Sequence, residues 1–334
     1  MINVLKANFS YEFEHETSYL GYRAYPQQEG LIVVIPANYV DENVLSEQYV
    51  ITTYLQQSGF QHIAVPVYSN DGKFIVAVNE NKSVYLCYVY PLSDYVDYTT
   101  LPAFLQQFHH AGHPFPYTPI YANRYGKWKE NWESILDQLD FLRQSFYEKE
   151  QLTNWERLWL ECSFYFVGIG ENAIQFLQES NEEKHFNHFD QPVFTLERAS
   201  LLKEQTIIMP DQIVHDHPSR DLAEIIRGMI LTDGKNSIRE IVKLITEYHK
   251  ERPFSTFGLR LLYARLLFPI HFIDYSQEVF TLPQERLNET DYLQQFLGYQ
   301  REYEACLHQI HDEIYKQLQL ELPTVEWLKA YEIN

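Results

Sequence analysis

The sequence predicts an α+β protein with two lobes: a small, mainly antiparallel β lobe over residues 1–95 and a larger, mainly helical lobe over residues 96–334. Three observations support this prediction. Apolar and polar residues alternate through most of the first lobe, as they do in half-buried strands. From Thr99 onward the apolar residues recur at helical spacing. No stretch rich in proline, glycine and serine separates the two patterns, so we expect a tight hinge near Pro91–Asp97.

The first lobe is expected to hold a sheet with one helix inserted after its third strand. Strands are predicted over Met1–Glu14, Ser18–Tyr25 and the apolar run Leu31–Pro36. The next stretch, Asp41–Gln57, has apolar residues near one face and is followed by Ser58-Gly59, so it is predicted to be a helix. Further strands are predicted after it, separated by Asn-Asp-Gly and Asn-Glu-Asn-Lys turns, over residues 63–68, 73–78 and 83–90.

The second lobe contains one short β-like region, Pro192–Leu196 and Thr206–Met209, within a series of helical patterns. This region leads into Ile213–Gly228, where an apolar pair is followed by a turn at Pro218 and then by apolar residues at helical spacing. The order predicts a strand that passes into a helix. Ionisable residues are concentrated in this stretch: His215, Asp216, His217, Arg220 and Asp221. Such a cluster indicates either a buried structural network or an active site, and both interpretations stay open.

The charge balance argues against nucleic acid as a partner. The chain has 26 Lys and Arg against 46 Asp and Glu, and the net charge of −20 repels phosphate over most of the surface. Its three cysteines, Cys87, Cys162 and Cys306, are far apart and lack zinc-ligand spacing, which is typical of reduced cytosolic thiols. No uninterrupted apolar run reaches the length of a membrane span. We therefore expect a protein without a membrane span that is cytoplasmic where it is made.

Two segments resemble the aminoglycoside-phosphotransferase-like kinases. Leu101–Gly112 (L-P-A-F-L-Q-Q-F-H-H-A-G) is similar to the helix after their hinge, and Arg220–Arg227 (R-D-L-A-E-I-I-R) resembles the Asp-Leu-Ala segment after their metal-binding loop. Four segments resemble one branch of this fold, the CotS/YutH-like spore coat proteins of endospore-forming bacilli: Arg124–Trp132, Gly170–Leu177, Asp216–Glu224 and Phe254–Pro269. The resemblance implies a protein-kinase-like fold, other spore coat proteins as partners, and a path from the cytoplasm of the mother cell to the spore coat.

Kinase chemistry requires a phosphate-binding loop, a cation on the phosphates, a base, and carboxylates for magnesium. The loop expected between the first two strands, Glu14–Gly21, has a single glycine and two carboxylates that would repel phosphate. The third strand, Leu31–Pro36, has no lysine, and Arg23 on the second strand is the nearest substitute. Glu47, in the helix after the third strand, then has no lysine to pair with, so we predict that it lies on a solvated helix face. These features predict that the chain binds neither ATP nor Mg²⁺.

Two alignments of the catalytic loop stay open. The first places Leu196, Glu197 and Arg198 at the His-Gly-Asp motif of the related kinases, so that a guanidinium, which cannot accept a proton, replaces the base. The second uses His188 and Asp190, which keeps a carboxylate but has no apolar strand before it. We prefer the first alignment, because the loop has to be held by a buried strand.

The resemblance gives two candidates for a magnesium ligand, Asp216 and Asp211. Asp216 lies closer to Asp221 than the metal-binding aspartate does in the related kinases, so Asp216 is either the ligand of a shortened loop or a structural residue. In the second case only Asp211 remains as a ligand. Arg220 and Asp221 belong to the structural motif. We predict that Asp221 is buried and accepts hydrogen bonds from backbone amides near the catalytic loop.

Two functions are compatible with these residues. The first is a spore coat-associated, kinase-fold protein without phosphotransferase activity that acts as a binding or structural component. The second is a divergent small-molecule kinase that uses ATP and Mg²⁺ with Asp190 and Asp211 or Asp216 on an unknown hydroxylated substrate. The missing lysine and the missing glycine loop favour the first function. The substrate, the coat partner and the oligomeric state do not follow from the sequence.

Overall fold

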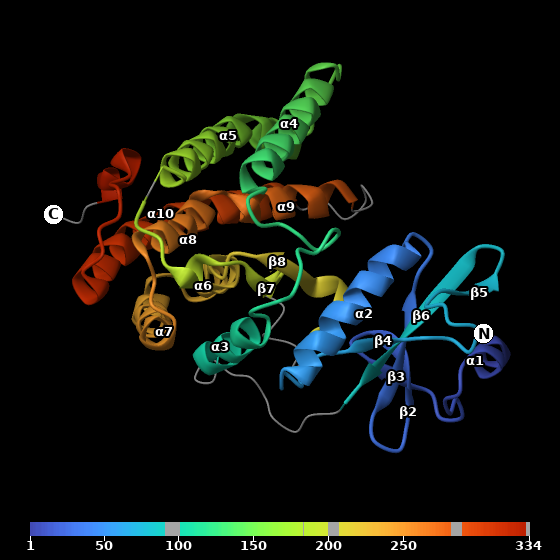
Figure 1. The fold of residues 1–334 in the computed structure, drawn as a ribbon. Coiled ribbons are helices and arrows are strands. Elements are labelled where there is room, and N and C mark those ends of the chain that lie inside the picture. The colour runs from blue at the N-terminus through green and yellow to red at the C-terminus, as the bar shows by residue number, and fades with distance from the viewer. Residues whose placement is uncertain (91–100, 183, 200–206, 282–288, 332–334) are drawn as a thin grey trace. The chain divides into compact units, whose positions relative to one another are not determined.

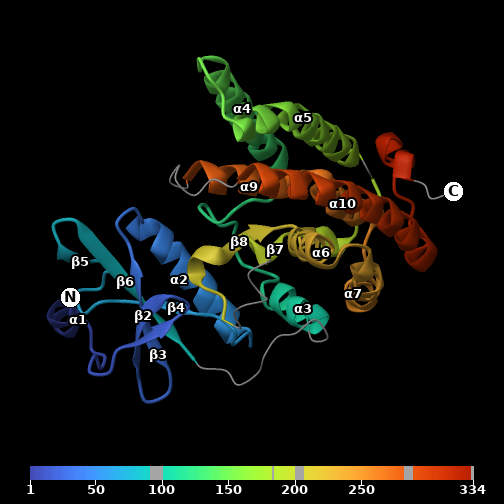
Figure 2. The same ribbon diagram turned by 180° about the vertical axis from the view of Figure 1, so that it is seen from behind.

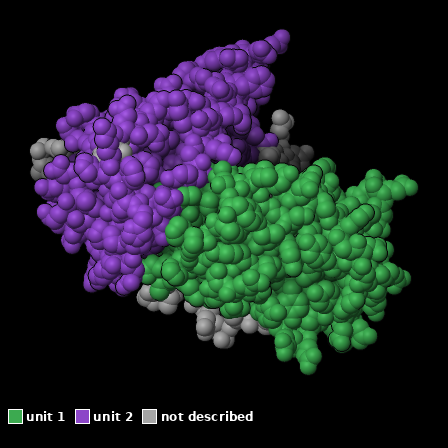
Figure 3. Space-filling view, in the orientation of Figure 1, with its two compact units in different colours: residues 1–124, 192–218 green, residues 125–191, 219–334 purple. Residues whose placement is uncertain are grey.

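The computed structural model describes residues 1–90, 101–182, 184–199, 207–281 and 289–331. The chain divides into two compact units (Figure 3). Unit 1 consists of Met1–Arg124 and Pro192–Pro218, and unit 2 consists of Tyr125–Gln191 and Ser219–Asn334. The hinge predicted near Pro91–Asp97 lies outside the described residues. The short β region of the second half of the chain thus groups with the N-terminal sheet, and the chain passes between the units more than once.

Unit 1 is built on a six-stranded sheet with the order β1-β2-β3-β6-β4, in which β5 pairs with β6 (Figure 1). All the strand pairs of this sheet are antiparallel. The strands are β1 (Thr17–Tyr19), β2 (Tyr22–Pro26), β3 (Leu31–Pro36), β4 (Val65–Val67), β5 (Val76–Asn79) and β6 (Lys82–Val89). The predicted antiparallel sheet is confirmed.

Helices cover both faces of this sheet. Helix α2 (Glu42–Gln57) packs on one face, where Leu45 joins Val33 and Ile35 of β3 in an apolar cluster. Helix α1 (Ile2–Asn8) packs on the other face, where its Leu5 joins the alternate residues of β3. Because successive side chains of a strand point to opposite faces, β3 fills both clusters with apolar groups.

The strand predicted over Met1–Glu14 is wrong, because its first half is helix α1. Leu5 and Phe9 are four residues apart, and both are buried in the cluster on the same face of the sheet. Side chains at this spacing share one side of a helix, whereas a strand would place them one behind the other along its length. The apolar residues of the segment fit both periods, and the packing surface of the sheet selects the helix.

The strand predicted over Ser18–Tyr25 is a hairpin of β1 and β2. Leu20 and Gly21 form its two-residue turn, and their φ angles of 49° and 78° are both in the left-handed region. A two-residue turn with two positive φ angles matches the twist of an antiparallel hairpin. The helix predicted over Asp41–Gln57 is confirmed, and the Asp41 side chain caps it by accepting a hydrogen bond of 2.7 Å from the Asn43 amide.

The remaining elements of unit 1 come from later parts of the chain. They are α3 (Leu101–Ala111), β7 (Val193–Leu196), the 3-10 turn η3 (Pro210–Gln212) and β8 (Ile213–Asp216). Strands β7 and β8 form a separate antiparallel pair, and α3 packs against β7. The strand predicted at Thr206–Met209 is wrong in its described part, since Ile208 makes only an isolated bridge to Ile63.

Unit 2 is helical (Figures 1 and 2). Its helices are α4 (Trp128–Tyr147), α5 (Asn154–Ser180), α6 (Ser219–Asp233), α7 (Ile238–Glu251), α8 (Thr256–Leu267), α9 (Ile270–Thr281) and α10 (Glu289–Leu318), with the short turns η1 (His188–Asp190), η4 (Gly234–Ser237) and η6 (Glu326–Tyr331). Aromatic rings fill its core. Phe166 of α5 stacks on Phe272 of α9 with ring centroids 3.9 Å apart, and Trp132 stacks on Phe268 at 4.4 Å.

The stretch Ile213–Gly228 joins β8 to α6, as predicted, and every residue from Ile213 to Arg227 is buried. Within the described residues, Thr256–Phe280 has the length and apolar composition of a membrane span. However, 78% of its apolar window is buried inside the protein. Helices that are apolar on all sides are also found in protein cores.

Candidate functional site

The candidate phosphate loop is shorter than the sequence suggested. Because β1 and β2 are a tight hairpin, only Leu20 and Gly21 connect them, and Glu16 lies just before the first strand. Tyr19 and Tyr22 flank this turn, and both pack against the apolar cluster on the α2 face of the sheet. A two-residue turn offers too few backbone amides to surround phosphate groups, which usually lie in a glycine-rich loop.

Strand β3 carries no charge toward either face. Val33 and Ile35 are buried on the α2 face, and Ile32 and Val34 are buried on the α1 face. Arg23, the substitute cation, pairs across the sheet with Val34, so that its side chain leaves the sheet on the side opposite Ile35. Its guanidinium lies 3.7 Å from the Glu16 carboxylate and is largely exposed.

The prediction for Glu47 was wrong. Its side chain does not lie free on a solvated face of α2 but accepts hydrogen bonds from three consecutive backbone amides of unit 1. The amides belong to Ile120, Tyr121 and Ala122, and the last two donate over 2.9 and 2.8 Å. Consecutive amides that converge on one carboxylate form an anion-binding nest. A carboxylate that would face a lysine in an active kinase therefore holds a loop here.

A second glutamate holds the first turn of the same helix. Glu42 accepts hydrogen bonds from the amides of Phe74 and Ile75, which lie just before β5. Helix α2 is therefore attached to two different backbone segments by two charged side chains. Since hydrogen bonds to an ionised acceptor are about twice as strong as neutral ones, these contacts fix the position of α2 within unit 1.

The residues of the first catalytic-loop alignment lie at the end of β7. Leu196 is the last residue of that strand and is buried. The Glu197 amide donates to the Gln212 carbonyl over 2.7 Å, and the Glu197 carboxylate lies 3.3 Å from the Arg124 guanidinium. Arg198 follows and is half-buried. The structure thus brings this loop position next to η3, which contains Asp211.

The residues of the second alignment lie in unit 2, in η1. Asp190 is buried, and both of its carboxylate oxygens accept hydrogen bonds, from the Asn187 amide over 2.6 Å and from the Ser255 hydroxyl over 2.9 Å. The Asn187 side chain in turn accepts from the Phe189 amide. This reciprocal arrangement is a capping box. In this structure the Asp190 carboxylate holds a turn, and His188 lies beside it.

Asp211 and Asp216, the two candidate metal ligands, lie in different environments. Asp211 is an exposed residue, but protein atoms around its carboxyl group raise its pKa through desolvation. Burial raises the pKa of Cys87, which lies on the α2 face of the sheet, and the charge of Asp211 raises it further. Asp216, at the end of β8, is fully buried and accepts a hydrogen bond from the His217 amide. Of these two aspartates only Asp211 has an exposed residue surface.

The ionisable cluster of Ile213–Gly228 is buried in the structure. Burial lowers the pKa of His215, and nearby His113 lowers it further, while Asp216 and Glu47 act in the opposite direction. No group of three or more His, Cys, Asp and Glu side chains with the geometry of a metal site occurs among the described residues. The predicted burial of Asp221 is confirmed.

Sequence reasoning missed an ion network within α6 and α8 of unit 2. Glu224 accepts from the Arg227 guanidinium over 2.7 Å, and the Arg265 guanidinium lies 3.4 Å from the same oxygen. Arg227 also donates to the Arg265 carbonyl, and all three side chains are buried. The motif R-D-L-A-E-I-I-R contains two of these residues at i and i+3, which is the signal that identifies the pair.

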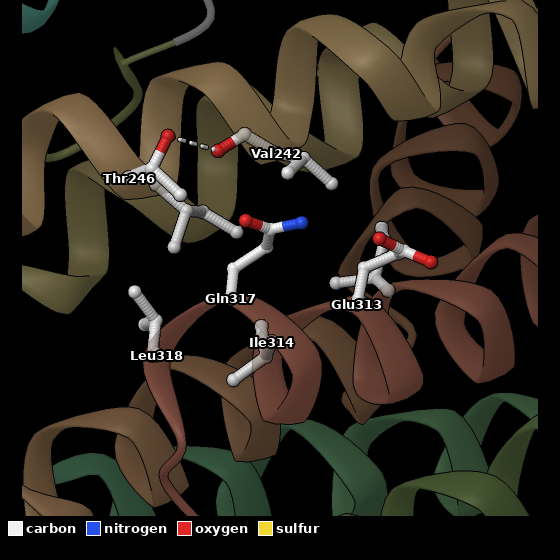
Figure 4. Close-up of a pocket in the computed structure, with 8 residues that line it drawn as sticks. Val242, Thr246, Glu313, Ile314, Gln317 and Leu318 are labelled. Carbon is white, nitrogen blue, oxygen red and sulfur yellow. Dashed lines mark hydrogen bonds between the residues drawn. The ribbon is translucent and has the colours of Figure 1, made fainter.

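A small pocket lies between α7 and α10 of unit 2 (Figure 4). Its lining is mainly aliphatic, and Gln317 extends into the space between the helices. The Thr246 hydroxyl at its edge donates to the Val242 carbonyl over 2.8 Å and so is already bonded. The lining contains no residue of the candidate site.

Comparison with solved structures defines the class of fold. An aminoglycoside phosphotransferase from Alicyclobacillus acidocaldarius matches with a TM-score of 0.65 at 10% sequence identity, over 93% of this chain and 95% of that chain. A microcompartment-associated aminopropanol kinase matches with 0.57 at 10% identity, over 93% and 95%. Spectinomycin phosphotransferase in its AMP-bound complex matches with 0.56 at 14% identity, over 88% and 93%. The chain therefore has the aminoglycoside-phosphotransferase-like, protein-kinase-like fold that was predicted.

Sequence comparison then identifies the family. The family model described as "Spore coat putative kinase YutH" matches residues 2–310, and the chain belongs to this family. One relative is the endospore coat-associated protein YutH of Bacillus subtilis, which is 27% identical over 321 residues that cover 92% of this chain and 91% of the relative. The resemblance inferred from the sequence motifs is confirmed.

Proposed function

We propose that the chain is a component of the bacterial spore coat that keeps a kinase fold, transfers no phosphoryl group and acts by binding other coat proteins. The coat assignment is supported by the family and by the name of the Bacillus subtilis relative. Under this proposal the chain is made in the cytoplasm of the mother cell and is then deposited in the coat. The charge of −20 argues against nucleic acid as a partner.

One observation gives the main support for a protein without phosphotransferase activity: the whole of β3 between Ile32 and Ile35 is buried in two apolar clusters. Phosphoryl transfer depends on a cation that neutralises the phosphates. In β3 the cation would have to replace Val33 or Ile35, because these two side chains face α2 and its Leu45. The cluster around these side chains has no cation among its described members, and the Glu47 carboxylate that would pair with the cation binds backbone amides.

The catalytic loop and the phosphate loop support the same conclusion. The first alignment places Arg198 at the position of the base, and an arginine cannot accept a proton at neutral pH. The β1–β2 turn has only Leu20 and Gly21. Of the two candidate metal ligands only Asp211 is exposed, and its negative charge would repel the phosphates of a nucleotide.

Calorimetry with Mg-ATP tests this proposal. We expect no saturable binding below about 1 mM and no rise in the melting temperature, because a ligand that binds only the native state has to stabilise it. A micromolar dissociation constant that is lost in Asp211→Asn would refute the proposal. It would support the alternative, a divergent small-molecule kinase that uses ATP and Mg²⁺.

A further inference from the structure

An exposed apolar strap follows α3 along the chain in unit 1. We define it as residues Tyr117–Tyr121. Ile120 is 76% exposed, Tyr117 46% and Tyr121 44%, and Ile120 is the most exposed isoleucine among the described residues. Three large, exposed side chains thus lie within five residues, whereas most surfaces carry such side chains singly.

The backbone on the C-terminal side of this strap is held in place. Its last two amides and the Ala122 amide donate to Glu47. The Ala122 carbonyl accepts from the His215 amide, and the Arg124 amide donates to the His215 carbonyl, both over 2.9 Å. The strap is thus attached to α2 and to β8 through backbone groups, which leaves the Ile120 side chain exposed. In Figure 1 this green segment runs beside α2.

Aromatic packing holds the N-terminal side. Phe115 lies edge-on to Tyr54 of α2 and to Phe194 of β7, with ring centroids 5.0 and 4.8 Å apart. The Tyr54 hydroxyl also donates to the Pro114 carbonyl. A loop that is fixed at both ends loses little conformational entropy when it binds, so its exposed side chains are preorganised for a partner.

We propose that the Tyr117–Tyr121 strap is a protein-docking surface that binds an apolar pocket with a cationic rim on another coat protein. The inference rests on the proposed coat function. Ile120 is the central anchor, because it is the most exposed of the three apolar side chains. A cationic rim fits because the chain has a charge of −20, and Arg124, which follows the strap in the sequence, is paired with Glu197. The same charge opposes a second copy of this chain as the partner.

The test compares two exposed apolar residues. Ile120→Asp alters the strap, and Phe141→Asp alters a residue of α4 that is 74% exposed and lies in unit 2. The full chains, fused to a fluorescent protein, are expressed in a sporulating host that lacks its own copy, and the fluorescence of the coat is measured. We expect Ile120→Asp to lower deposition about 10-fold or more, as the loss of a central anchor does, and Phe141→Asp to leave it unchanged.

Three measurements keep the comparison clear. The melting temperatures of both variants should equal that of the wild type, because neither side chain is buried. Binding of the purified full chain to coats isolated from the same host should weaken as salt rises, because a cationic rim is screened. Sedimentation equilibrium should show the same mass for the wild type and Ile120→Asp.

The possible outcomes separate the two proposals. Normal deposition of Ile120→Asp, or equal loss in Phe141→Asp, would overturn the docking surface and leave the coat function intact. A wild-type chain that no sporulating host deposits in its coat would overturn the coat function itself. A wild-type dimer that Ile120→Asp dissociates would show a second copy on the strap, and binding to coats that is insensitive to salt would exclude the cationic rim.

Discussion

Glu47→Ala tests the role that the structure assigns to α2. The substitution removes the acceptor of three backbone amides, of which those of Ile120 and Tyr121 are exposed and that of Ala122 is partly buried. Hydrogen bonds to a charged acceptor contribute about 1.5–3 kcal/mol when they are shielded, and water replaces the exposed ones at little cost. We therefore expect a loss of about 2 kcal/mol in the free energy of unfolding, with about half of that in Glu47→Gln, which keeps one acceptor oxygen.

Urea denaturation measures the loss of stability, and amide hydrogen exchange locates it. If about 2 kcal/mol of local stability is lost, the amides of residues 120–122 should exchange about 30-fold faster, because each 1.4 kcal/mol is a factor of ten. Glu42→Ala is the matched control, since Glu42 is on the same helix but accepts from Phe74 and Ile75. It should accelerate exchange at those two amides only. Unchanged exchange at residues 120–122 in Glu47→Ala would refute the reasoning.

Three further predictions follow. Asp221→Ala should lower the free energy of unfolding, measured in urea, by about 1–3 kcal/mol, because Asp221 is fully buried. Asp233→Ala, at the exposed end of α6, should change it by less than about 0.5 kcal/mol, and equal effects of the two substitutions would contradict the assigned burial. Ile35→Lys should leave Mg-ATP binding undetectable by calorimetry. It should also lower the free energy of unfolding by about 3 kcal/mol, because it buries a charge in an apolar cluster. Micromolar binding of Mg-ATP to this variant would show that the lysine alone was missing. Burial and Arg227 lower the pKa of His271 to about 4, below the ordinary 6.5, so the unfolded chain takes up this proton first as the pH falls. The free energy of unfolding, measured by urea titration, should therefore be highest above about pH 6.5 and fall by about 2 kcal/mol by pH 5. This part of the pH dependence should disappear in His271→Asn.

The sequence motifs identified the family because they lie where packing constrains residue type most strongly. Ile213–Gly228 was predicted to be a strand that passes into a helix, and every residue from Ile213 to Arg227 is buried. A buried segment tolerates few substitutions, so that its pattern of residues is characteristic of the fold. The apolar β3 was also readable from sequence, since a strand that is buried on both faces appears as a continuous apolar run.

The local sequence pattern gave a wrong secondary structure where the apolar residues fit both a helical and a strand period. Met1–Glu14 fits an alternating pattern, yet Ile2–Asn8 is a helix because Leu5 and Phe9 pack on one face of the sheet. Ser18–Tyr25 appeared as one strand, because Leu20-Gly21 is not among the dipeptides that mark two-residue turns most strongly. In both cases the decision depends on a surface that residues far along the chain provide.

The sequence by itself determined the fold class, the family and the absence of a lysine in β3, because these depend on residue types at single positions and on local periodicity. Only the tertiary structure decided what the charged side chains do. Glu47 binds the amides of residues 120–122, and Asp190 binds Ser255, 65 positions later. A carboxylate looks the same in a sequence whether it faces water, a metal ion or a backbone amide. Its partner is set by the folding of distant segments, which no local pattern encodes.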